Sequence, residues 1–116
     1  MPITKLSECI LESQKDLIEN NVVAPMVGHV GDGNFHLLML CDPNNKEEMN
    51  RLKNINDRLV KRAISMGGTC TGEHGIGLGK KEYLELEHPT NIKLMKKIKN
   101  IFDPNNIMNP NKIIDN

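Results

Sequence analysis

The sequence predicts an α+β fold in which a small antiparallel sheet is covered by helices. Three observations support this class: an amphipathic pattern opens the chain, two apolar segments follow on either side of a glycine turn, and amphipathic helical patterns come after them. The length of 116 residues fits one domain with a single modest core. We therefore expect one domain over residues 1–116.

The first half of the chain provides the predicted sheet and its two longest helices. Residues 6–19 have helical spacing, residues 21–26 begin a β-branched strand, and residues 35–40 read as a buried apolar strand. Residues 42–45 form a turn before a long amphipathic helix, which the glycines at 67–68 end. The apolar positions expected to face the core are Leu6, Cys9, Ile10 and Leu17 in the first helix, and Met49, Leu52, Leu59, Val60, Ala63 and Met66 in the second.

The second half is expected to add one more helix and a tail. Thr90 or Asn91 can cap this helix, and the Asp103-Pro104 step ends it. Residues 109–114 are expected to be extended. The predicted buried positions of this helix are Leu94, Met95, Ile98, Ile101 and Phe102.

Composition excludes several functions. Fifteen basic and 15 acidic residues give a net charge of zero, which argues against a nucleic-acid module or a polybasic membrane anchor. No apolar run approaches the ~20 residues that a membrane helix needs, and the start of the chain has no targeting pattern. The cysteines form no C-x-x-C pair, which is typical of reduced thiols in an intracellular protein.

All nine glycines lie in two stretches, residues 28–33 and 67–79, and three of the four histidines lie in or directly beside them. In the first, GHVGDGNFH at residues 28–36, His29 and His36 flank a turn that can bring both imidazoles together. Two imidazoles and a carboxylate commonly hold a catalytic divalent metal, and Asp32 is the local carboxylate candidate. The alternative is a hairpin with two incidental histidines, in which Asp32 only shapes the turn.

The second window, residues 68–80, frames the adjacent Glu73 and His74 with five glycines. Neighbours in an extended segment point in opposite directions, so one can bind a metal while the other faces a substrate. The spacing fits neither a Walker loop nor a dinucleotide fingerprint. The alternative is a glycine-rich crossover loop with a solvated Glu-His pair.

The two windows in this order resemble the C-terminal part of the FAD-linked oxidase family, which has the vanillyl-alcohol-oxidase-type fold. The segments GHVGDGNFH at 28–36 and GTCTGEHGIG at 68–77 resemble the family's two motifs, and Asp103-Pro104 with IMNPNK at 107–112 resembles its ending. The likeness runs from about residue 21 to residue 114 and is closest to members that oxidise D-lactate or glycolate.

The resemblance implies the C-terminal part of the family's cap, or substrate, domain. It implies that His29, His36 and Glu73 bind a divalent metal, Zn²⁺ or Mn²⁺, and that His74 is the general base. It also places Asn109 near the flavin region. Family members oxidise a small D-2-hydroxy acid to a 2-oxo acid and reduce FAD.

The family's flavin-binding domain has no counterpart in these 116 residues. We therefore expect a catalytic fragment that is inactive without a flavin domain or subunit and that self-associates through exposed apolar surface. The expected compartment is intracellular, cytoplasmic in a bacterium and mitochondrial in a eukaryote. The alternatives are a non-enzymatic folded remnant or interaction module, and a small metal-dependent hydrolase.

Overall fold

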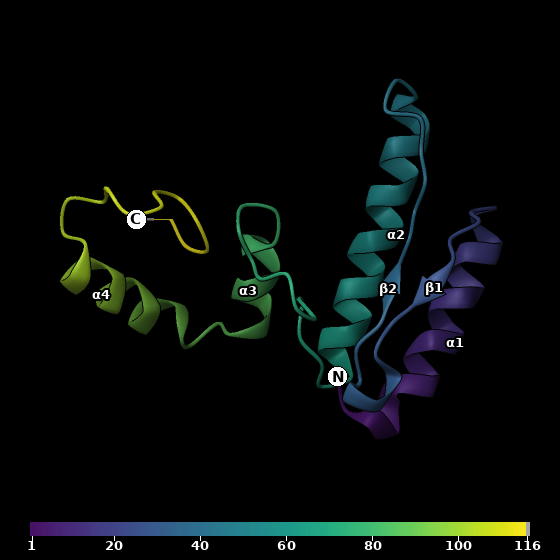
Figure 1. The fold of residues 1–116 in the computed structure, drawn as a ribbon, viewed down its shortest axis with the longest axis horizontal. Coiled ribbons are helices and arrows are strands. Elements are labelled where there is room, and N and C mark those ends of the chain that lie inside the picture. Colours follow the sequence, from purple (N-terminus) through teal and green to yellow (C-terminus); the bar gives the residue numbers. More distant parts are fainter. Residues whose placement is uncertain (116) are drawn as a thin grey trace. The chain divides into compact units, whose positions relative to one another are not determined.

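The computed structural model describes residues 1–115 and is mostly helical, with one two-stranded antiparallel sheet (Figure 1). The expected α+β class is therefore confirmed in part: the helices and an antiparallel strand pair are present, but the sheet is very small. The chain divides into two compact units, Met1–Thr69 and a second unit that begins at Cys70. The elements are α1 (Ile3–Glu19), β1 (Met26–Val27), the 3₁₀ turn η1 (Val30–Asp32), β2 (His36–Leu37), α2 (Lys46–Ser65), α3 (Lys81–Glu87) and α4 (Ile92–Phe102).

In the first unit, α1 contacts α2, and the β1–β2 hairpin runs alongside them (Figure 1). Leu17 of α1 and Leu52 and Ile55 of α2 form the buried apolar cluster, with Ile55 only 1% exposed. Leu37 of β2 packs against this cluster. The helices thus form here because each buries one apolar face against the other.

A polar cluster joins the same two helices. Asp16 is 8% exposed and accepts hydrogen bonds from Arg58 Nε at 2.9 Å and Nη2 at 2.6 Å. Arg62 Nη2 lies 3.3 Å from the same carboxylate, and its Nη1 donates to Ser13 at 3.0 Å. Hydrogen bonds from Arg58 hold the pKa of Asp16 below its usual value, against the opposing effect of burial.

Both long helices end in a Schellman motif. At the end of α1 the N–H of Val22 bonds to Leu17 O at 2.9 Å, and Asn21 takes the left-handed conformation at φ 52°. At the end of α2 the N–H of Gly68 bonds to Ala63 O at 2.8 Å, with Gly67 at φ 78°. The predicted glycine stop at 67–68 is confirmed.

The strands are shorter than expected. Residues 21 and 22 end α1 instead of starting a strand, so β1 keeps only Met26–Val27, and β2 keeps only His36–Leu37. The expectation that residues 35–40 are all buried is wrong, because side chains alternate across a strand and the helices cover one face. Leu37 and Met39 pack against the core, whereas Leu38 is 50% and Leu40 is 82% exposed.

The second unit contains the glycine-rich segment, α3, α4 and the tail. Its buried apolar side chains are Cys70, Tyr83, Leu84 and Ile92. The predicted burial of the α4 stripe is wrong, since no element described in this unit packs broadly on it. Four of its predicted core residues are 48–78% exposed, namely Leu94, Ile98, Ile101 and Phe102.

The tail is bent rather than extended. Asn109 has φ 47°, Asn111 has φ 61° and Ile113 has φ 69°. Asparagine tolerates the left-handed region better than most residues, which explains the first two bends but not the third. Among the described residues, no helix is both long enough and apolar enough to cross a membrane.

Candidate functional site

The first window forms the predicted turn. The N–H groups of Asp32 and Asn34 bond to His29 O at 2.9 and 3.2 Å, and η1 closes the loop. Gly33 has φ 69° and lies against the first residue of the chain, whose amino group donates to Gly33 O at 2.8 Å. A Cβ at Gly33 would collide with the carbonyl of Met1, so both the conformation and the close approach require glycine.

The two histidines beside this turn differ in secondary structure and in solvent exposure. His36 lies in β2 opposite Val27, is partly buried, and has its Nε2 3.4 Å from Asn34 Nδ2. His29 precedes η1 and is exposed, as is Asp32 within the turn. The hairpin that returns the chain is therefore confirmed.

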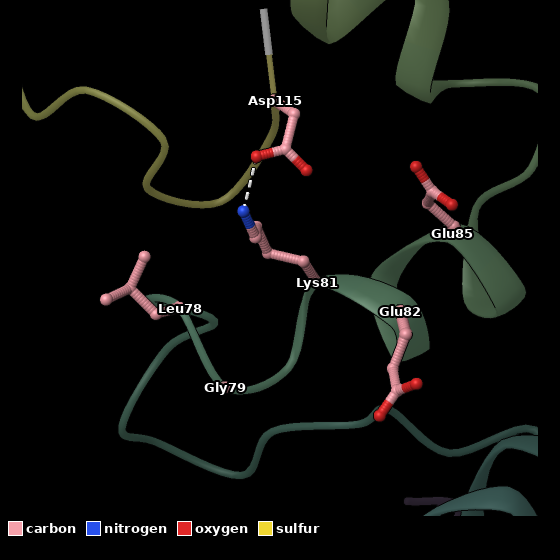
Figure 2. Close-up of a pocket in the computed structure, with 6 residues that line it drawn as sticks. All are labelled: Leu78, Gly79, Lys81, Glu82, Glu85 and Asp115. Atoms are coloured by element: carbon pink, nitrogen blue, oxygen red, sulfur yellow. Dashed lines mark hydrogen bonds and ion pairs between the residues drawn. The ribbon is translucent and has the colours of Figure 1, made fainter.

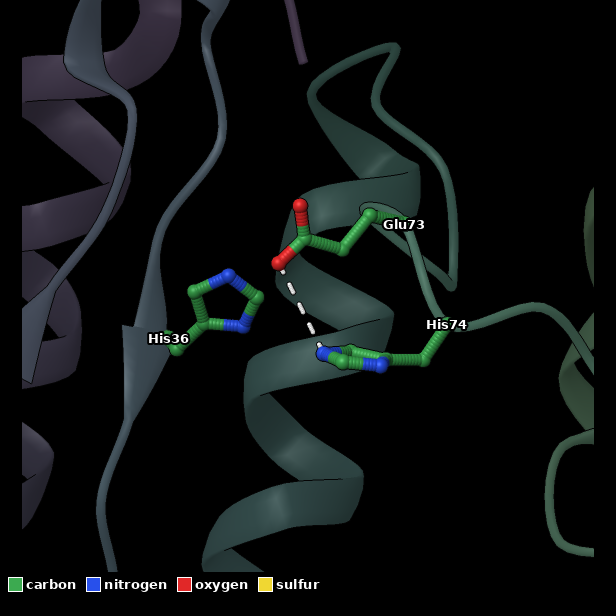
Figure 3. A group of neighbouring side chains, drawn as sticks. All are labelled: His36, Glu73 and His74. Atoms are coloured by element: carbon green, nitrogen blue, oxygen red, sulfur yellow. Dashed lines mark ion pairs between the residues drawn. The ribbon is translucent and has the colours of Figure 1, made fainter.

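The second window carries Glu73 and His74 on a bend between glycines. Figure 3 draws this pair and His36, with the ion pair from Glu73 Oε1 to His74 Nε2, 3.5 Å apart, as a dashed line. The expectation that neighbours 73 and 74 point in opposite directions is wrong, because the segment bends here instead of extending. Gly75 at φ 76° supplies part of that bend. Both side chains are solvent-accessible, with Glu73 46% and His74 79% exposed.

Sequence reasoning missed Glu87, whose carboxylate holds the start of this window. Glu87 Oε2 accepts the backbone N–H of Cys70 at 2.8 Å, and its Oε1 lies 3.2 Å from His88 Nε2. Burial, together with a hydrogen bond to Glu87, raises the pKa of the Cys70 thiol to about 11. No pattern of residue types links positions 70 and 87, so only the folded chain reveals this contact.

The end of the second unit is also held by a buried carboxylate. Asp103 accepts the N–H groups of Ile107 and Met108, each at 2.9 Å, and pairs with Lys99. These hydrogen bonds, led by that from Lys99, lower the pKa of Asp103. Asn109 follows this turn and is exposed.

The second unit has an open pocket of about 340 Å³ (Figure 2). Lys81 pairs with Asp115 there and donates to Asn111 O at 3.1 Å. Three carboxylates against one ammonium make the lining net negative, which does not suit the pyrophosphate of FAD. The lining residues are Leu78, Gly79, Lys81, Glu82, Glu85 and Asp115.

The possible metal ligands belong to both units of the chain. Within the described residues of either unit taken alone, no three His, Cys, Asp or Glu side chains cluster closely enough to hold an ion. His29 and His36 belong to the first unit, and Glu73 and His74 to the second. Imidazole and carboxylate donors are nevertheless the chemistry that Zn²⁺ and Mn²⁺ take.

Comparison with known proteins decides the family. The sequence matches the model for FAD linked oxidases, C-terminal domain, over residues 1–113. The chain belongs to this family. The resemblance read from the two windows and the ending is thereby confirmed.

Individual relatives of this FAD-linked oxidase domain are also similar. A probable mitochondrial D-lactate dehydrogenase of Danio rerio is 50% identical over 99% of the chain and 23% of its own length. The mitochondrial D-lactate dehydrogenase (cytochrome) of Arabidopsis thaliana is 44% identical over 98% of the chain and 20% of its own length. Glycolate oxidase subunit GlcD of Bacillus subtilis is 46% identical over 74% of the chain and 18% of its own length. The chain thus spans about a fifth of the length of these relatives.

Proposed function

We propose that this chain supplies the metal ligands and the general base of an FAD-dependent D-2-hydroxy-acid dehydrogenase, which converts D-lactate or glycolate to the 2-oxo acid. The observation that carries the proposal is the solvent-accessible Glu73-His74 pair on a glycine-rich bend, in a chain of the FAD-linked oxidase family. Both side chains can meet a ligand from solvent, as catalytic groups must.

The proposed metal ligands are His29, His36 and Glu73. Two neutral imidazoles and one carboxylate suit Zn²⁺ or Mn²⁺ and leave coordination positions open. When bound, the metal would supply a Lewis acid that lowers the pKa of the substrate hydroxyl and attracts its carboxylate.

His74 is the proposed base. Its imidazole ring can accept the C2 hydroxyl proton at neutral pH, which leaves the hydroxyl oxygen ready to form the carbonyl as hydride departs. FAD, when bound, is the hydride acceptor. We propose that the flavin is held mainly outside these 116 residues, with Asn109 near it, and that the chain alone does not turn over substrate.

The proposed partners are a small 2-hydroxy acid, a flavin-binding domain or subunit and, through the exposed side chains of α4, a second copy of this chain. The two eukaryotic relatives named above are mitochondrial proteins. We propose the same compartment for this chain if its source is eukaryotic, and the cytoplasm if its source is bacterial.

Elemental mass spectrometry of the purified chain tests the metal site. We expect about one divalent ion per chain after incubation with Zn²⁺ or Mn²⁺, and loss of that ion in Glu73→Ala. Glu85→Ala is the matched control, since Glu85 is exposed in the same unit and belongs to no proposed ligand set. Absence of metal from the wild-type chain would reject the site.

Kinetics test the base. In an assembly in which D-lactate reduces flavin, His74→Ala is expected to lower kcat by about 10²–10⁴-fold because a general base is lost. Its metal content should stay unchanged, which separates loss of the base from loss of the site. A normal kcat would remove His74 from this role.

A non-enzymatic folded remnant is the second candidate. The exposure of Glu73 and His74, 46% and 79%, is also what a solvated pair on a glycine-rich loop shows. This candidate binds a metal only structurally or not at all, and it predicts no flavin reduction when a flavin-binding partner and D-lactate are added.

A further inference from the structure

Glu87, in α3, contacts the beginning of the glycine-rich window through a hydrogen bond to the backbone. Its side chain is 13% exposed, although a carboxylate removed from water is unfavourable unless hydrogen bonds replace the lost hydration. Oε2 accepts the N–H of Cys70 at 2.8 Å, across 17 residues of sequence. Oε1 faces His88 Nε2 at 3.2 Å. The carboxylate is therefore committed on both oxygens.

Cys70 is a second point of attachment for the same carboxylate. The residue is 4% exposed, and burial is the first cause that raises the pKa of its thiol, with the neighbouring Glu87 carboxylate second. With a pKa of about 11 the thiol stays protonated at neutral pH, so Cys70 is not a nucleophile. The contact between Cys70 and Glu87 that positions the chain is therefore the backbone hydrogen bond at 2.8 Å.

The other end of the window has its own hydrogen bond. The N–H of Ile113 donates to Gly77 O at 2.8 Å. Between Cys70 and Gly77 the chain has Gly72 and Gly75, which add no side-chain packing and allow many backbone conformations. The positions of Glu73 and His74 on this segment therefore depend on how its two ends are held.

We propose that Glu87 is a positioning residue for the Glu73-His74 bend, because it fixes the backbone three residues before Glu73. This inference rests on the proposed function, since it takes Glu73 as a metal ligand and His74 as the base. Glu87 touches neither metal nor substrate in this role and acts only through Cys70.

The test uses four proteins: wild type, Glu87→Ala, Glu87→Gln and Glu85→Ala. Titration calorimetry measures the Zn²⁺ affinity of each, and NMR measures the hydrogen exchange rate of the Cys70 amide. Glu87→Ala is expected to weaken Zn²⁺ binding by about tenfold, as loss of a supporting hydrogen bond does at other metal sites, and to speed exchange of the Cys70 amide. Glu87→Gln keeps an oxygen that can accept this N–H, so most of the affinity should return. Glu85→Ala, which removes an exposed carboxylate from the same helix, should change neither quantity.

The Glu73→Ala variant distinguishes failure of the positioning role from failure of the metal site. If wild type binds Zn²⁺, Glu73→Ala does not, and Glu87→Ala binds as wild type does, the positioning role is wrong and the proposed metal site stands. If wild type binds no Zn²⁺, the proposed site is wrong and the positioning role falls with it. Should Glu87→Ala unfold, Glu87→Asp replaces it, since its shorter side chain withdraws the carboxylate from Cys70; wild-type affinity in that variant would overturn the role.

Discussion

The two units of the chain are stabilised in different ways. The first unit has two long helices, an apolar cluster around Ile55 and a buried Asp16 bonded to two arginines. The second has two shorter helices, and single carboxylates, Glu87 and Asp103, hold its turns. The proposed base lies in the second unit, while most of the buried apolar side chains lie in the first. The first unit is thus organised around a helix–helix interface, whereas individual carboxylates hold the turns of the second.

The largest effect is expected at the centre of the first unit. Ile55→Ala removes a side chain that is 1% exposed and should lower the free energy of unfolding by about 3 kcal/mol, from lost burial and the cavity left behind. Urea unfolding followed by circular dichroism measures it. Ile18→Ala is the control, because Ile18 is 75% exposed on α1. Equal losses for the two variants would mean that the cluster is not the core.

Breaking the polar cluster should rank second. Asp16→Ala leaves Arg58 and Arg62 without their buried acceptor, and we expect a loss of about 2 kcal/mol, which is in the range for hydrogen bonds to charged groups. Asp57→Ala removes the 2.9 Å pair with exposed Lys61 and should cost less than about 0.5 kcal/mol. An equally small loss for Asp16→Ala would show that the helices do not depend on this cluster.

Acid should weaken the first unit through the same carboxylate. Hydrogen bonds from Arg58 keep the pKa of Asp16 below 3.8 in the folded chain. The unfolded chain therefore binds the proton first, and the stability that Asp16 contributes is present above about pH 4 and is lost as the pH falls through its folded pKa. Urea midpoints measured from pH 6 downward should fall more steeply in wild type than in Asp16→Asn. Parallel curves would contradict this assignment.

Local signals predicted the elements of the first unit well. Apolar spacing identified α1 within three residues of its observed start. The expected turn at 42–45 precedes α2, and the structure adds that Asn45 Oδ1 caps this helix by accepting the N–H of Glu48 at 3.1 Å. The Asp16–Arg58 contact was not predictable, because it joins residues 42 positions apart that belong to no motif. The predicted strand length was also wrong, because the Schellman turn after α1 includes Val22, whose β-branched side chain favours a strand.

At the candidate site, too, local sequence pattern predicted which residues matter, but it did not predict their tertiary contacts. Glycine and histidine content singled out Glu73 and His74, but the direction of their side chains was misjudged because the flanking glycines bend the backbone. The stripe on α4 was correctly seen as amphipathic, yet periodicity states which residues share a face and not what covers them. Ile98 is therefore 48% exposed in spite of its position in the stripe.

Removal of the N-cap of α2 should lower the free energy of unfolding by less than either core change in the first unit. Asn45→Ala removes the acceptor for the Glu48 N–H and should cost about 1 kcal/mol in urea unfolding. Asn54→Ala makes the same substitution at an exposed site inside α2 and should be neutral or slightly stabilising, since alanine favours a helix interior. A loss from Asn54→Ala as large as that from Asn45→Ala would remove capping as the explanation.

The smallest effect is expected on α4, and it decides whether the two units really differ. Ile98→Ala removes a side chain that is 48% exposed, so the free energy of unfolding should change by less than about 0.5 kcal/mol. Sedimentation of wild type and Ile98→Lys, over a range of concentrations, reports whether this face joins two copies. If Ile98→Ala costs as much as Ile55→Ala in a monomeric chain, α4 has a buried face in solution, and the second unit has a core comparable to the first. If the cost is small and Ile98→Lys abolishes self-association, the apolar face of α4 serves contacts between molecules. The unit that carries Glu73 and His74 is then held by the buried side chains around Tyr83 and by the carboxylates of Glu87 and Asp103.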